Sequence, residues 1–184
     1  GNRLLLLGAL AIFFYVGVEV SIGSLLVNFI ADPDIGNMSV ASASKYVTWF
    51  WLGAMIGRFL GAFLMYVIQP AFILLFNAFL ACCLIVIAVF TSGHIALWSM
   101  LAVGLCNSIM FPTIFSLSIS RAGKYKSIAS GVLCLAIVGG AIIPMLQGLV
   151  VDAVGLQRSL LLPVAGYFYI LFYASGVLRF SGQD

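Results

Sequence analysis

The chain has 184 residues, of which 64% are hydrophobic and only 7% are charged, with a formal net charge of +3. A soluble domain carries about 45–50% apolar and about 25% charged residues, so this composition excludes a soluble fold and indicates a membrane protein. The small net charge gives no indication of nucleic-acid binding, and the length is that of one compact domain.

Six apolar stretches are long enough to cross a bilayer, which takes about 20 helical residues. They cover residues 4–30, 46–68, 71–91, 95–120, 128–151 and 160–178. Short polar breaks separate them, and no long linker appears. The sequence therefore predicts an all-α membrane domain of six transmembrane helices over residues 1–184.

The first of these helices carries the only glutamate of the chain, Glu19, close to its middle. A carboxylate inside a bilayer is costly, and it normally faces a bundle interior or a water-filled cavity. At helical spacing, Tyr15 and Gly23 share its face. A second stripe of small and polar residues comprises Gly17, Ser21, Ser24 and Asn28. Glu19 is interpreted either as a ligand-binding cavity residue or as a packing residue that bonds a neighbouring helix.

The second helix combines a glycine repeat with a tryptophan and an arginine. Gly53, Gly57 and Gly61 are spaced by four, which permits close approach of another helix. Trp49, near the outer end, fits either the aromatic belt of a membrane protein or a stacking contact with a ligand. Arg58 lies inside the helix and needs a partner or a path to the surface, so we interpret it as a gating or structural charge.

The fourth helix places Asn107 near mid-membrane and Pro112 shortly after it. Proline inside a span frees a backbone carbonyl and bends the helix. An amide beside the rings of Phe111 and Phe115 suits a polyhydroxylated ligand, since the amide bonds hydroxyls and a ring covers an apolar face. The alternatives are an amide that joins two helices and aromatic rings that only pack.

The fifth helix contains Gly139, Gly140 and Pro144, which predict a hinge or a close packing contact. Signals for an enzyme are poor, because the only histidine, His94, falls in an outer turn and no phosphate loop or catalytic pair appears. The four cysteines lack metal-site spacing. We therefore predict that the protein is not an enzyme and that it has no metal site and no organic cofactor.

The basic residues gather on one side of the predicted membrane domain. That side carries Arg3, Arg121, Lys124, Lys126 and Arg179, whereas the other carries only Lys45 and Arg158. Cytoplasmic loops carry an excess of Lys and Arg, so both ends of this chain are predicted to be cytoplasmic.

Four segments carry a more specific signal: FFYVGVEVSIGS at 13–24, GRFLGAF at 57–63, FPTIFSLSI at 111–119 and VGGAIIPMLQGLVVDAVG at 138–155. In this order they resemble the fucose–galactose–glucose:proton symporter family of the major facilitator superfamily, and within it the glucose/galactose permeases. The resemblance covers essentially the whole chain.

The resemblance implies that the chain is the C-terminal half of a major facilitator fold, with two inverted three-helix repeats and a partner N-terminal half. The first and fourth helices of each half line the cavity in such transporters. Glu19 and Asn107 would then bind hydroxyls of a glucose- or galactose-type hexose, with Tyr15, Phe111 or Trp49 covering the ring. The whole protein would be a proton-coupled symporter of the bacterial inner membrane, working by alternating access.

One departure from the family is the absence of the half that carries its proton-coupling residues. The resemblance places the acidic residues tied to proton coupling in the N-terminal half, so it assigns Glu19 to the sugar, with a titrating Glu19 as the alternative. Without its partner half, this chain is expected to leave Glu19 and Asn107 exposed at an open groove. For the chain as a whole, the alternative is an independent six-span module or a half-size homodimeric transporter.

Overall fold

The computed structural model describes residues 2–120 and 122–181, and within these ranges the regular structure is helical throughout. Arg121, which the charge analysis used, lies outside the described residues. The elements are α1 Asn2–Ala31, α2 Val40–Leu64, α3 Pro70–Phe90, α4 Gly93–Asn107, α5 Met110–Ile119, the 3-10 turn η1 Gly123–Tyr125, α6 Lys126–Leu135, the 3-10 turn η2 Ala136–Val138, α7 Gly139–Val154, α8 Leu156–Ser159 and α9 Leu161–Ser181.

Six helical runs are long and apolar enough to cross a membrane, which confirms the predicted helical membrane architecture. The runs are Arg3–Ala31, Val40–Leu64, Pro70–Phe90, Gly93–Ile119, Gly123–Val154 and Leu156–Arg179. Three of them are composite, because α4 and α5, α6 to α7, and α8 and α9 are each interrupted by a turn or a change of helical type.

The second helix begins earlier than the sequence pattern suggested. It starts at Val40 and ends at Leu64, whereas the apolar stretch covers 46–68. The reason is the cap at Ser39, whose hydroxyl accepts a hydrogen bond from the Ser42 N–H at 3.2 Å. The polar residues after Ser39 are therefore the first turns of a helix rather than a loop.

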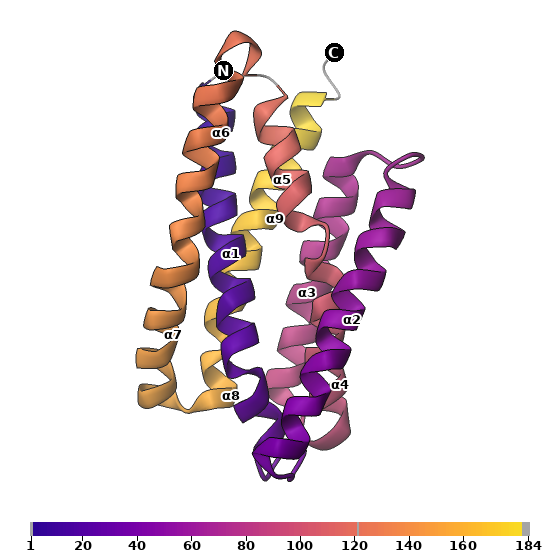
Figure 1. The fold of residues 1–184 in the computed structure, drawn as a ribbon, viewed down its shortest axis with the longest axis vertical. Coiled ribbons are helices and arrows are strands. Elements are labelled where there is room, and N and C mark those ends of the chain that lie inside the picture. Colours follow the sequence, from indigo (N-terminus) through magenta and orange to yellow (C-terminus); the bar gives the residue numbers. More distant parts are fainter. Residues whose placement is uncertain (1, 121, 182–184) are drawn as a thin grey trace.

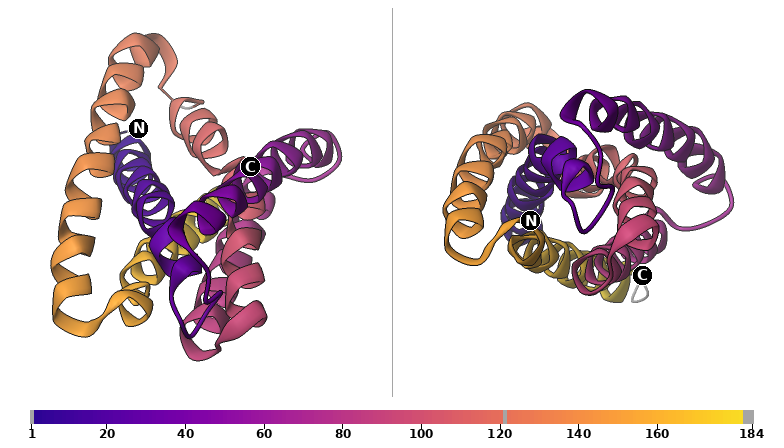
Figure 2. Two further views of the ribbon diagram at one scale, coloured as in Figure 1. Left: turned by 60° about the horizontal axis from the view of Figure 1, so that its bottom comes forward. Right: turned by 90° about the horizontal axis from the view of Figure 1, so that it is seen from below.

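The helices form one bundle with α1 near its centre (Figures 1 and 2). Helix α1 packs against α2, α5, α7 and α9, while α3 packs against α4 and α9. The start of α1, the η1 turn and the end of α9 lie at one end of the bundle (Figure 1). The loop between α1 and α2 and the short helix α8 lie at the other end. The core contains large, fully buried side chains such as Tyr167, Tyr173, Phe29 and Phe50.

Helices α1 and α7 are in backbone contact. A Cβ added to Gly139 would lie 2.0 Å from the Phe13 carbonyl oxygen, and one added to Gly17 would lie 2.3 Å from Ile143 Cγ1. In a bilayer the lipid tails are as apolar as the protein, so helices associate mainly through such close packing of small residues. Gly139 thus lies at the contact that fixes α7 on α1.

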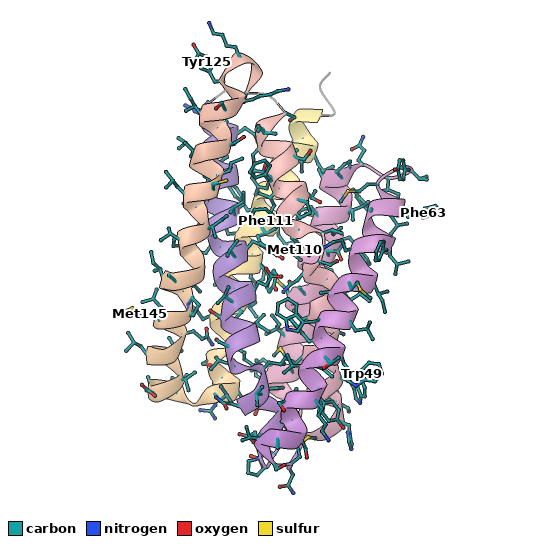
Figure 3. All side chains as sticks on the ribbon, in the orientation of Figure 1. Trp49, Phe63, Met110, Phe111, Tyr125 and Met145 are labelled. Carbon is teal, nitrogen blue, oxygen red and sulfur yellow. The ribbon has the colours of Figure 1, made fainter. Side chains whose placement is uncertain are left out.

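Large apolar side chains cover the outside of α2 and α7. Figure 3 shows Phe63 and Trp49 pointing outward from α2 and Met145 pointing outward from α7. Phe63 is 69% exposed and Met145 is 72% exposed. A soluble protein rarely exposes patches of this kind, so these faces are built to contact lipid or another apolar helix.

Candidate functional site

The fourth membrane run is broken between α4 and α5. Helix α4 ends at Asn107, and α5 begins at Met110. Pro112 follows, and because proline has no N–H it cannot bond the Ser108 carbonyl four residues earlier. The Ser108 hydroxyl donates to the Leu105 carbonyl at 2.9 Å and so does not bond the carbonyls of the break. The Ser108 carbonyl therefore lacks the amide donor that a regular helix would give it.

Asn107 is held by two tyrosines from other helices. Its Oδ1 accepts a short hydrogen bond from the Tyr167 hydroxyl of α9, and its backbone oxygen accepts one from the Tyr15 hydroxyl of α1 at 2.9 Å. The side chain is only 1% exposed. Its Nδ2 is buried and has no partner among the described residues. The expectation that Asn107 is exposed at an open groove is therefore wrong, because Tyr167 draws the amide into the core.

Glu19 has a different environment from Asn107. Its carboxylate is half-buried on α1, one helical turn after Tyr15. Val20 and Ser24, which follow Glu19 on α1, are exposed. Glu19 is thus a partly accessible acceptor on α1, one helical turn from the Tyr15 phenol.

Aromatic rings of α1 and α5 lie next to one another near the α4–α5 break. The ring centroids of Tyr15 and Phe111 are 6.4 Å apart, and those of Phe111 and Phe115 are 6.1 Å apart with the rings stacked. Figure 3 shows Phe111 toward the middle of the bundle and Trp49 on the outer side of α2. The structure brings Tyr15, Asn107 and Phe111 together, whereas Trp49 is 55% exposed and lies apart from them.

Helix α2 supports the break from the opposite side. The Arg58 Nε donates to the Ser108 carbonyl at 3.4 Å. A Cβ on Gly57 would lie 2.2 Å from the Leu105 carbonyl oxygen, and one on Gly61 would lie 2.3 Å from Ile109 Cγ2. The two glycines therefore allow α2 to lie directly on the end of α4, which brings Arg58 to the Ser108 carbonyl.

The remaining predicted structural residues lie on α7. A Cβ on Gly140 would lie 3.0 Å from Val16 Cγ1, so this glycine also faces α1. Pro144 is inside α7. Both belong to the span that packs on α1, away from the Asn107 break.

Tyr167 was not among the predicted site residues. A tyrosine inside an apolar span needs a partner for its hydroxyl, and this signal was available from the sixth helix. The sequence did not show which polar group it meets, because Tyr167 and Asn107 are 60 positions apart in the chain.

The arrangement suits binding of a hydroxylated ligand rather than catalysis. It offers the half-buried Glu19 carboxylate, which can accept hydrogen bonds from hydroxyls, and the half-buried Phe111 ring, which can cover an apolar face. Within the residues that the structure describes, no group of three or more His, Cys, Asp or Glu residues could hold a metal ion.

The fold is that of a six-helix half of a major facilitator superfamily transporter. A solved structure of such a transporter, FucP in the outward conformation, superposes with a TM-score of 0.92 and 31% sequence identity, over 96% of this chain and 42% of that chain. No family model matches the sequence.

Curated proteins with similar sequences are named as transporters of particular sugars. The chain is 54% identical over 171 residues to a glucose/galactose transporter of Brucella abortus biovar 1, which covers 93% of this chain and 42% of that protein. It is 49% identical over 172 residues to a putative glucose/galactose transporter of Helicobacter pylori J99, across 91% of this chain and 42% of that protein. It is 34% identical over 178 residues to the L-fucose-proton symporter of Escherichia coli K12, across 95% of this chain and 39% of that protein.

These matches confirm the resemblance to the fucose–galactose–glucose:proton symporter family. The similar proteins are transporters and not enzymes, and the six apolar helices make this chain a multi-pass membrane protein. The chain spans about two fifths of the length of the curated relatives it matches, 42% for the Brucella protein.

Proposed function

We propose that this chain is the C-terminal six-helix half of a proton-coupled hexose symporter in a bacterial inner membrane. It forms one wall of a central sugar site and works by alternating access with an N-terminal half. The observation that carries the proposal is the structural match to FucP, which covers 96% of this chain but 42% of that chain. The glucose/galactose and L-fucose transporters at 54% and 34% identity support a hexose as the substrate.

Glu19 is the proposed sugar acceptor. Its half-buried carboxylate is the partly accessible charge on the central helix, and a carboxylate can accept hydrogen bonds from two adjacent hydroxyls. The Phe111 ring, whose centroid is 6.4 Å from that of Tyr15, is the proposed cover for the apolar face of the sugar. Asn107 supports the site from behind, since its amide is buried against Tyr167.

The proton is proposed to be carried by acidic groups of the partner half. Two separate tasks would otherwise fall on Glu19, because a carboxylate that takes up a proton gives up part of its capacity to accept hydroxyl hydrogen bonds. Binding near the interface of two repeats is also the general arrangement in transporters of this architecture.

The experiment measures sugar binding and uptake by the full-length transporter with Glu19→Gln. An amide removes the charge and one acceptor, so the Kd for D-glucose or D-galactose is expected to rise about 10- to 100-fold, as for other hydrogen bonds to charged groups. Asp152→Asn, which removes an exposed carboxylate at the end of α7, is the matched control and should leave the Kd unchanged. Wild-type affinity in Glu19→Gln would show that the sugar does not bind this carboxylate.

A further inference from the structure

Helix α7 buries one stripe of residues, and one member of that stripe is polar. The buried residues of α7 are Gly139, Ile143 and Gln147, which are spaced by four and therefore share one face of the helix. The Gln147 side chain is 1% exposed. An amide buried in a membrane protein is costly unless its polar atoms are bonded within the bundle, because the bilayer core offers no partner.

Half of the Gln147 amide is bonded to α8. Its Nε2 donates to the Ser159 carbonyl and to the Ser159 hydroxyl oxygen, both at 2.9 Å. That hydroxyl donates in turn to the Leu156 carbonyl at 2.6 Å, so it accepts from Gln147. The two acceptors fix which end of the amide is the nitrogen, and Oε1 is the end turned away from them. Within the residues that the structure describes, this buried oxygen has no hydrogen-bond partner.

Helix α1 supplies a second unpartnered polar group. Ser21 is fully buried, and its Oγ has no hydrogen-bond partner in the described part of the chain. Helices α1 and α7 run in the same direction (Figure 1), and their close contacts advance together. Gly139 lies against Phe13, and Gly17 lies against Ile143 one turn further on. The next turn of this register pairs Ser21 on α1 with the buried glutamine on α7.

Pro144 leaves a third acceptor at the same contact. Proline has no N–H, so the Gly140 carbonyl lacks the amide donor that a regular helix would give it. Gly140 faces α1, because a Cβ there would lie 3.4 Å from Cγ2 of Val20, the residue before Ser21. Carbonyls in a helix point toward its C-terminal end, so this oxygen is directed along α7 toward the turn that carries Gln147.

We propose that Ser21, Gln147 and the Gly140 carbonyl bind one buried water molecule between α1 and α7. One water matches these groups, since its two O–H bonds donate to the Gln147 Oε1 and the Gly140 oxygen, and its own oxygen accepts from the Ser21 hydroxyl. Three hydrogen bonds are the usual number for a water buried in a protein. Through the Gln147 amide, this water connects α1 and α7 to Ser159, directly before α9.

The first test is the effect of Ser21→Ala on the apparent Tm of the full-length transporter in detergent. Removal of a hydroxyl that bonds a water leaves that water one donor short, so the Tm is expected to fall by roughly 1–4 °C. Removal of a hydroxyl that bonds nothing would keep the Tm level or raise it, because a buried hydroxyl without a partner is itself destabilising. A level or raised Tm would therefore overturn the proposal.

The second test is a double-mutant cycle with Gln147→Met, which keeps the length of the side chain but removes the amide. Without Oε1 the water loses its acceptor, so on this background Ser21→Ala is expected to shift the Tm by less than about 1 °C. Ser24→Ala is the control, since the Ser24 hydroxyl bonds the Ser21 carbonyl and the residue is exposed. Its effect should be the same on both backgrounds. Additive shifts for Ser21→Ala and Gln147→Met would contradict a shared water.

A map of the full-length transporter at a resolution that shows ordered waters gives the direct observation. We expect one density peak within about 2.7–3.2 Å of Ser21 Oγ, Gln147 Oε1 and the Gly140 oxygen. A direct hydrogen bond from Ser21 to Gln147, with no peak between them, would replace the water and overturn the proposal. None of these measurements depends on the sugar, so their outcome is independent of the proposed function.

Discussion

Tyr15 and Tyr167 reach Asn107 from two different helices and bond its backbone and side-chain oxygens. A buried polar group without a partner is expensive in a bilayer, so each of these hydrogen bonds fixes one helix relative to another. Asn107 at the end of α4 consequently connects α4 to α1 and α9 through hydrogen bonds. Glu19, one turn from Tyr15, is only half-buried and stays partly accessible.

Tyr167→Phe tests this connection. The substitution keeps the ring but leaves the buried Asn107 Oδ1 without its donor, which costs about 1–3 kcal/mol. The apparent Tm of the purified protein in detergent is expected to fall by roughly 2–8 °C. Differential scanning fluorimetry measures the shift.

Tyr169→Phe serves as its control. The Tyr169 hydroxyl donates to the Leu7 carbonyl at 3.3 Å and is exposed, so its loss should change the Tm by less than about 1 °C. Equal shifts for the two substitutions would mean that the bond between Tyr167 and Asn107 does not stabilise the bundle.

The sequence could identify which residues are polar at membrane depth, but not what each one bonds. Glu19, Tyr15 and Asn107 stand out because an apolar span makes every polar side chain conspicuous. Whether the Asn107 side chain is exposed in a groove or buried in the core depends on Tyr167, which lies 60 positions further along the chain. Only the packing of α9 against the other helices brings the two together.

At the level of the elements, hydropathy predicts the helices, but the sequence predicts only some of their interruptions. Pro112 marks the break after α4 because it lacks an N–H. The 3-10 turn η2 at Ala136–Val138 has no proline and no polar residue to signal it. Likewise, Gln157 donates to the carbonyls of Ala88 at 2.9 Å and Thr91 at 2.7 Å, a cap for the end of α3 that comes from a segment interpreted as a loop.

Gly139→Ala tests the contact between α1 and α7. The new Cβ would lie 2.0 Å from the Phe13 carbonyl oxygen, and because that atom belongs to the backbone, no side-chain rotation relieves the clash. Separation of the two helices is expected to cost on the order of 1–3 kcal/mol and to lower the apparent Tm by several degrees.

Gly148→Ala is the control on the same helix. A Cβ there meets nothing within 4 Å, so the change adds helix propensity without a clash and the Tm should stay level or rise. If Gly139→Ala were as stable as Gly148→Ala, the backbone contact would not be what holds α7.

For the whole molecule, the orientation in the membrane is open to a direct test. Lys124 and Lys126 lie at the same end of the bundle as the start of α1 and the end of α9, whereas Asp34 lies in the loop at the opposite end (Figure 1). The positive-inside rule predicts that the lysine end is cytoplasmic.

Single cysteines at these positions give the measurement. In a background without the native cysteines, Asp34→Cys should react with a membrane-impermeant maleimide in intact cells, and Lys124→Cys should react only after the membrane is permeabilised. The reverse pattern would invert the orientation and place both described ends outside.

The η2 turn gives the two parts of one membrane span different attachments. Helix α7 is anchored to α1 through Gly139 and the buried Ile143, whereas α6 buries only Ala129 and Leu133 among its residues. A 3-10 segment between them interrupts the regular α-helical bonding, so the two parts need not move as one rod. Tilting α6 therefore disrupts few buried contacts, so the part of this span near the lysine end is held less firmly than the part anchored on α1.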